Sequence, residues 1–282
     1  MTEEVRPIDN TRFIPYMGSE KLNPDLGVKP GLTWIPISNL VIEDEYQREL
    51  FTQHAIDIGR IARQFNWSSF GCVVVCNIGD NQFAIVDGQR RTIAASLRNI
   101  TEVPCVIITA TLQERAEAFS AINSAVIPIS PLSIFNAQLI GRDPKALKIS
   151  AACKEAGVVI RKYPCAYQLM GWNETSAITS IIDVFDTCGK DILILGLKCL
   201  INASRKTRKT VLKAGIIKGL CNVLESEGTF RAPEYRLLAV MEGFDFEEEY
   251  KKAGLESKQG RKHVQQAFAL RVFRHLDEAL GE

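Results

Sequence analysis

The chain has 282 residues, with 34 basic and 33 acidic side chains, so its net charge at pH 7 is +1. A charge so close to zero excludes a global electrostatic field that would recruit nucleic acid to the whole molecule. The content of 46% hydrophobic and 24% charged residues is typical of a soluble globular protein. The length predicts one large domain or two smaller ones.

The pattern of residues does not favour export, membrane insertion or a structural metal site. Residues 1–6 are acidic and polar, unlike an ordinary secretory signal. The most apolar run, 192–201, is interrupted by Gly196 and Lys198 and has about half of the ~20 residues that a membrane span needs. We therefore expect a cytoplasmic protein whose eight cysteines are reduced thiols in core positions. No set of Cys and His residues has zinc spacing, so no metal site is predicted.

Strand and helix patterns over residues 31–128 predict a small mixed α/β (α+β) domain, preceded by an irregular arm over residues 1–30. Two of its strands are expected to pair across a turn at 79–81. In chain order, the expected elements are a strand at 34–37, a helix at 53–65, strands at 72–76 and 83–86, a helix opening around 89, a strand at 103–108 and a helix around 114–123.

The most informative segment runs from Phe83 to Leu97. Its β-branched start predicts a buried strand that ends at the turn dipeptide Asp87-Gly88, since glycine accepts backbone angles that a side chain forbids. Gln89-Arg90-Arg91 then opens a helix. Free N–H groups at a helix start carry partial positive charge, and arginine adds a planar, bidentate donor. The segment therefore predicts an anion site, with phosphate as the favoured anion.

Two other interpretations of this segment remain open. In one, Asp87 simply caps the helix and the arginines lie solvated on its outer face. In the other, Asp87 is catalytic, because a carboxylate at a strand end can act as a general base or ion ligand.

The order of elements over residues 31–128 resembles that of the ParB/sulfiredoxin-like domain of bacteria and phages. Gly88-Gln89-Arg90-Arg91 resembles the Gly-Glu-Arg-Arg phosphate-binding box of ParB partition proteins. Asp87-Gly88-Gln89-Arg90 is similar to the Asp-Gly-Gln-His-Arg signature of a related group that includes regulators of DNA modification. Gln47-Arg48 resembles the earlier arginine box of these proteins, and residues 118–123 resemble their Phe…Ile-Asn helix end.

This resemblance implies a DNA-associated protein of a bacterium, plasmid or phage. The ligand that it implies is a nucleotide, such as a nucleoside triphosphate with Mg²⁺, or a phosphate of the DNA backbone. The residues that the resemblance assigns to this ligand are Arg48, Gly88, Gln89, Arg90, Arg91 and Asn123.

Two departures from the family pattern bear on activity. Gln89 replaces the glutamate of the ParB box, and Ile122 stands where a metal-associated glutamate would precede Asn123. Because a Mg²⁺ site usually needs one or two carboxylates, rapid hydrolysis of a nucleotide is not expected. Sulfiredoxins carry their catalytic cysteine at the position of Gln89, so sulfiredoxin activity is excluded.

Two alternatives to a ligand-binding protein stay open. The first is a metal-dependent nuclease of the ParB-like type, with carboxylates from Asp87, Glu49 or Glu114. The second is a non-catalytic interaction module, in which the arginine helix binds a protein carboxylate or a DNA phosphate. The sequence leaves open whether the protein is an enzyme; if it is one, a nucleotide hydrolase or a nuclease is expected. The sequence also leaves open whether two copies form a homodimer.

Residues 129–282 predict an all-helical second domain. Ser130-Pro131 and Asp143-Pro144 each combine a capping side chain with proline at the first helical position. A strand or packed loop is expected at 158–175. Beyond the two capped helices, helices are expected near 176–188, 190–204, 208–226, 233–242, 246–253 and 261–280.

The sharpest basic cluster of the chain lies in this second half. It holds four cations within five residues, and Lys213 and Lys218 extend it without an intervening acid. Such a cluster favours salt-sensitive binding of DNA independent of sequence. The alternative is a solvated turn between two helices. The four cations are Arg205, Lys206, Arg208 and Lys209.

Overall fold

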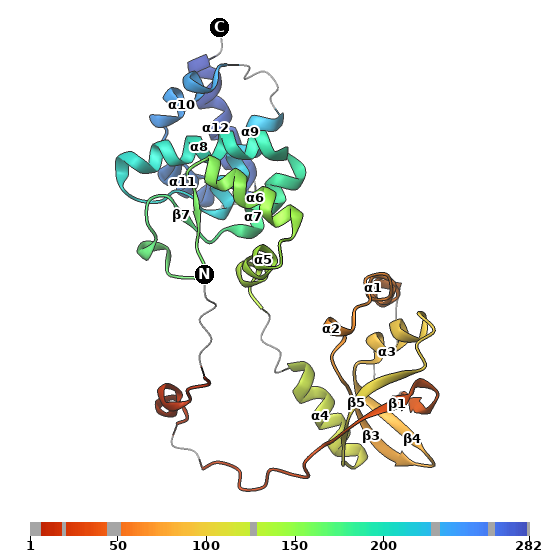
Figure 1. Cartoon of the computed structure of the whole chain (residues 1–282). Coiled ribbons are helices and arrows are strands. Elements are labelled where there is room, and N and C mark those ends of the chain that lie inside the picture. The colour runs from red at the N-terminus through yellow and green to blue at the C-terminus, as the bar shows by residue number, and fades with distance from the viewer. Residues whose placement is uncertain are drawn as a thin grey trace. The chain divides into compact units, whose positions relative to one another are not determined.

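The computed structural model describes residues 7–18, 21–43, 52–124, 129–226, 232–258 and 263–280. The side chains at positions 124, 206, 207 and 226 are also outside the described part. Contacts divide the chain into two compact units, Met1–Ile127 and Pro128–Glu282 (Figure 1).

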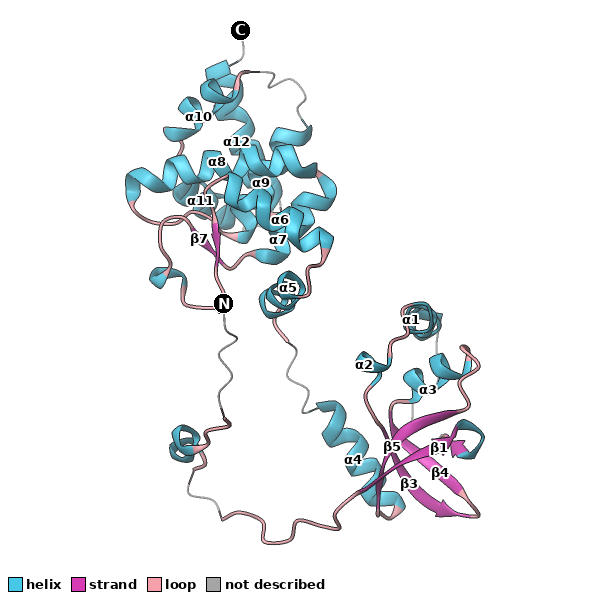
Figure 2. Ribbon diagram, viewed as in Figure 1, coloured by secondary structure: helices cyan, strands magenta, loops and turns pink. Residues whose placement is uncertain are grey.

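The first unit is built on a five-stranded mixed sheet with the strand order β1-β5-β3-β4-β2 (Figure 2). β3 runs parallel to β5 and antiparallel to β4, while β1 is antiparallel to β5 and β2 is parallel to β4. The predicted mixed α/β class is confirmed. The elements are η1 (Thr11–Tyr16), β1 (Gly31–Pro36), η2 (Ile37–Asn39), β2 (Leu40–Val41), α1 (Thr52–Arg63), α2 (Trp67–Phe70), β3 (Val73–Gly79), β4 (Gln82–Asp87), α3 (Gln89–Ser96), β5 (Glu102–Ile108) and α4 (Leu112–Ser124).

The central hairpin forms where the sequence predicts it. Gly79 pairs with Gln82, so the loop between β3 and β4 has only the two residues Asp80 and Asn81. Their φ angles are +49° and +57°. Two-residue hairpin loops favour such positive angles, which Asn and Asp tolerate better than other side chains.

One face of the sheet is covered by α2 and α3. Phe70 of α2 and Ala95 of α3 pack on Val75, Ile85 and their neighbours in a buried cluster. A smaller cluster joins α1 to α3 through residues 58, 62 and 94. The amphipathic pattern of α1 therefore places this helix beside the start of α3, with no strand between them.

The second unit is helical apart from two short parallel strands. Both predicted caps are present. The side chain of Ser130 accepts a hydrogen bond from the Ser133 N–H at 3.1 Å, and that of Asp143 accepts one from the Ala146 N–H at 2.8 Å. The elements are α5 (Pro131–Ile140), α6 (Pro144–Glu155), β6 (Val159–Ile160), η3 (Tyr167–Leu169), β7 (Glu174–Thr175), α7 (Ile178–Thr187), α8 (Gly189–Thr207), α9 (Ala214–Ser226), α10 (Glu234–Glu242), α11 (Phe246–Lys258) and α12 (Val264–Leu280).

One predicted helix start is wrong for a clear reason. The helix expected from residue 208 begins only at Ala214, because the preceding segment is held extended by tertiary hydrogen bonds. The Thr210 hydroxyl donates to the Glu174 carbonyl at 3.0 Å, and the Thr175 hydroxyl donates to the Leu212 carbonyl at 2.8 Å. α8 in turn continues to Thr207, and Arg208 ends it with a φ of +57°.

The cysteines are free thiols, but only part of the expectation of core positions is correct. Cys76, Cys105, Cys153, Cys199 and Cys221 are buried, whereas Cys72 is exposed and the other two are partly exposed. Burial raises the pKa of the Cys153 thiol to about 12. Within the described residues, no helix is both long and apolar enough to cross a membrane.

Candidate functional site

The turn between β4 and α3 depends on Gly88. Its φ is +103°, in the left-handed region that a side chain disfavours. A Cβ at this position would lie 3.3 Å from both Cα and Cγ1 of Val73. Gly88 itself is the N-cap residue, and no side chain caps α3. The alternative in which Asp87 caps the helix is therefore wrong.

Asp87 instead pairs with Arg91, whose guanidinium group forms two hydrogen bonds within the first unit. The Arg91 guanidinium donates to the Asp87 carboxylate at 2.7 Å and to the Phe70 carbonyl at 2.8 Å. It also lies against two glycines. A Cβ on Gly71 would come 2.7 Å from its Nη1, and one on Gly88 would come 3.2 Å from its Nη2. Arg91 thus ties the end of α2 to the end of β4.

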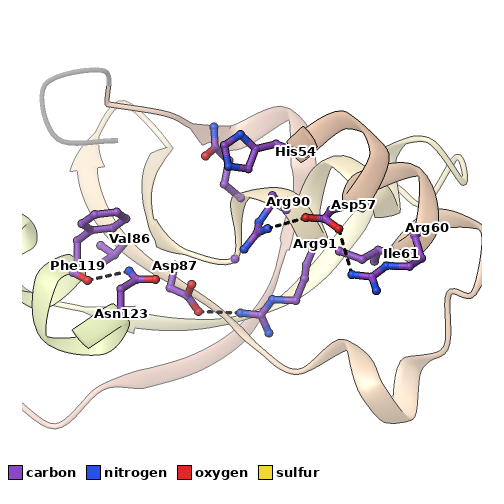
Figure 3. A pocket seen from close by; sticks show the side chains of 12 residues that line it. His54, Asp57, Arg60, Ile61, Val86, Asp87, Arg90, Arg91, Phe119 and Asn123 are labelled. Carbon is purple, nitrogen blue, oxygen red and sulfur yellow. Dashed lines mark hydrogen bonds and ion pairs between the residues drawn. The ribbon is translucent and has the colours of Figure 1, made fainter. Parts of the chain in front are cut away.

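Arg90 has a different environment from its neighbour. Its side chain is 52% exposed, and its Nη1 lies 3.4 Å from Oδ2 of Asp57 on α1. The other oxygen of Asp57 accepts a hydrogen bond from Arg60 at 3.1 Å, and the Arg60 side chain is 65% exposed. One carboxylate therefore holds two exposed guanidinium groups side by side (Figure 3). Because exposed ion pairs contribute little, both groups remain available to an anion.

A cavity of about 640 Å³ opens beside this turn (Figure 3). The five residues from Asp87 to Arg91 line it together with Asn123, so the structure brings together six of the site residues named from sequence. Asn123 uses its amide N–H to donate to the Phe119 carbonyl at 2.7 Å. Arg48 lies outside the described residues, so the expectation that it shares this cavity stays a prediction.

The sequence did not predict that α1 lines one side of the cavity. His54, Asp57 and Arg60 line the cavity from one face of this helix. Their spacing of three residues was the available signal, since residues three apart lie on the same side of a helix. Only the packing of α1 on α3 connects that face to the Gly88 turn.

The described residues of the cavity have the charge for an anion, and both of their carboxylates are already engaged by arginines rather than free for a Mg²⁺ ion. Three arginines and two aspartates line it, which gives a charge of +1 before His54 is counted. Both of these carboxylates are ion-paired with arginines. In the described ranges, no three His, Cys, Asp or Glu side chains are grouped to hold a metal.

Glu114, another carboxylate named for a nuclease, does not line this cavity. The Thr111 backbone N–H and hydroxyl both donate to Glu114, at 2.7 and 2.9 Å, which stabilises the start of α4. These bonds lower the pKa of Glu114. Glu49 lies outside the described residues.

The basic cluster of the second unit lies at the end of α8 and just beyond it. Arg205, Arg208 and Lys209 are exposed, whereas the side chain of Lys206 lies outside the described part. The two lysines that extend the cluster in sequence are engaged with acids. Lys213 pairs with Glu247 at 2.7 Å, and Lys218 pairs with Asp183 of α7.

The model of a family of unknown function (DUF6551) matches residues 42–270 of the chain. The chain belongs to this family. For this DUF6551 protein, the matched stretch includes both the cavity-lining residues and the basic cluster. A search of curated proteins found no match.

Two solved structures of the chromosome-partitioning protein ParB from Caulobacter crescentus are similar to this DUF6551 chain. The C-terminally truncated protein complexed with CTP-γ-S is 12% identical over 62% of this chain and 98% of the truncated chain, with a TM-score of 0.40. The truncated protein complexed to the centromeric parS site is 14% identical over 84% of this chain and 97% of the truncated chain, with a TM-score of 0.30.

Proposed function

We propose that this protein is a DNA-associated protein whose first unit binds a phosphate-bearing ligand, preferentially a nucleotide, in the cavity beside Gly88. One observation carries the proposal. Two exposed guanidinium groups, those of Arg60 and Arg90, stand together at the N-terminus of α3 in a cavity of about 640 Å³.

Each part of this arrangement suits a phosphate. Gly88 permits the tight turn that places the start of α3 at the cavity, and the first N–H groups of this helix carry partial positive charge. Arginine presents two parallel N–H groups that match the geometry of phosphate oxygens. The volume lies within the ~300–1,000 Å³ of typical small-molecule sites.

The proposed activity is binding without rapid turnover. Gln89 supplies an amide where the related box has a glutamate, and the two aspartates of the cavity are held by arginines. Attacking water and metal would both be poorly positioned, which disfavours phosphoryl transfer.

A panel of nucleoside triphosphates with Mg²⁺ tests this function. We expect one of them to raise the Tm, since a ligand at 100 times its Kd stabilises the bound state by about 2.7 kcal/mol. Phosphate release measured on the same preparation should be slow. Rapid release would make the protein a hydrolase, and metal-dependent cleavage of added DNA would make it a nuclease. No stabilisation by any nucleotide would favour the interaction-module alternative.

The cluster at the end of α8 is the proposed contact with DNA. Replacing its four cations with alanine should weaken DNA binding at low salt and flatten the dependence of affinity on salt, because fewer counterions are released. A matched control removes four exposed cations of α6 and its N-terminal flank. An equal effect in both variants would show that the cluster is not the contact. The control positions are Arg142, Lys145, Lys148 and Lys154.

A further inference from the structure

The loop between β6 and β7 is attached to the segment that follows α8. The Tyr167 hydroxyl donates to the Thr210 carbonyl, and the Thr210 hydroxyl donates to the Glu174 carbonyl at 3.0 Å. A third bond, from Thr175 to the Leu212 carbonyl, closes the set at 2.8 Å. The loop residues therefore share one surface of the second unit with the cations around position 208.

Two aromatic rings of this loop lie next to these cations. The guanidinium carbon of Arg205 is 5.6 Å from the ring centroid of Trp172. The ammonium of Lys213 is 4.4 Å from the ring centroid of Tyr167. Both distances are within the ~6 Å of a cation–π contact. Neither ring is buried. A set of six residues, which we call the basic–aromatic surface, consists of Tyr167, Trp172, Arg205, Arg208, Lys209 and Lys213.

The cations of this surface outnumber the acid that a described ion pair places beside it. It holds four cations, and Glu247 pairs with one of them, Lys213. The hydrogen bond from Lys213 lowers the pKa of Glu247, so this carboxylate is ionised at neutral pH. Four cations and this one paired acid therefore lie beside two partly exposed rings, of which Trp172 also packs on the core of the second unit.

We propose that the basic–aromatic surface binds single-stranded nucleic acid. This inference rests on the proposed association of the protein with DNA and specifies its form. A duplex keeps the faces of its bases stacked inside and offers a surface ring only phosphates and groove edges. A single strand offers phosphates to the cations and base faces to the rings. An arginine beside an indole also adds a second planar group on which a base can stack.

The chain allows a direct spectroscopic test. It has three tryptophans, and Trp172 is the one in the second unit. In a Trp34→Phe/Trp67→Phe background, fluorescence reports on this surface alone. Oligothymidylate should quench it and should bind more tightly than a duplex of the same length, with oligouridylate as the RNA arm. Trp172→Ala should weaken binding of the single strand about tenfold, and Trp172→Phe, which keeps a stacking ring, should restore most of the affinity.

The outcomes separate this inference from the proposed function. Equal affinity for both forms, with no quenching and no effect of Trp172→Ala, would overturn single-strand binding while leaving DNA association intact. No binding of either form at low salt would overturn both, although nucleotide binding in the first unit would still be judged by its own assay. If Trp172→Ala fails to fold, the quenching and the Trp172→Phe affinity decide the matter.

Discussion

Replacing Arg60 and Arg90 together by alanine should lower the affinity for a nucleotide at least ~100-fold, because each charge-assisted hydrogen bond lost costs about 1.5–3 kcal/mol. The Tm should hardly change. Both side chains are more than half exposed, and their ion pairs with Asp57 contribute little to stability. Calorimetric titration of the nucleotide and a thermal melt of the free protein measure the two quantities.

Two further variants sharpen this test. Arg98→Ala removes an exposed arginine just after α3 that does not line the cavity, and it should leave affinity unchanged. Asp57→Asn should raise affinity, because it removes a negative charge that faces the bound phosphate. If the double variant loses no more affinity than Arg98→Ala, the two guanidinium groups do not hold the ligand.

The parts of the fold that could be predicted are those decided by neighbouring residues. Ser130 and Asp143 cap their helices because a capping oxygen and a following proline act within one turn. The hairpin turn at Asp80 and Asn81 depends on the same kind of local preference. The strand–glycine–helix turn at Gly88 belongs with them.

The parts that could not be predicted depend on contacts between distant segments. The helix expected from residue 208 starts late because β7 holds the segment before it. Likewise, Asp57 meets Arg90 only because α1 packs on α3. The sequence pattern does not distinguish Arg90 from its neighbour Arg91. In the structure, however, the carbonyl of Phe70 gives Arg91 a hydrogen-bond partner inside the protein.

Arg91→Ala should lower the free energy of unfolding of the first unit by about 1–3 kcal/mol, the cost of leaving partly buried acceptors without a donor. Arg91 is 29% exposed, and its partner Asp87 is 33% exposed. The change leaves that carboxylate and the Phe70 carbonyl unsatisfied and opens a gap between Gly71 and Gly88. Denaturant unfolding followed by circular dichroism measures the loss.

Two neighbouring variants decide whether Arg91 acts as this internal tie. Arg91→Lys should recover little stability, because one ammonium on a flexible stem cannot reproduce the planar fork that reaches both acceptors. Arg90→Ala should leave stability unchanged, since that side chain is 52% exposed. Full stability in Arg91→Ala, with a loss of nucleotide affinity equal to that in Arg90→Ala, would instead make both arginines ligand contacts. The predicted split assigns adjacent residues of one helical turn to two tasks, Arg91 to shaping the Gly88 turn and Arg90 to the anion that the turn receives.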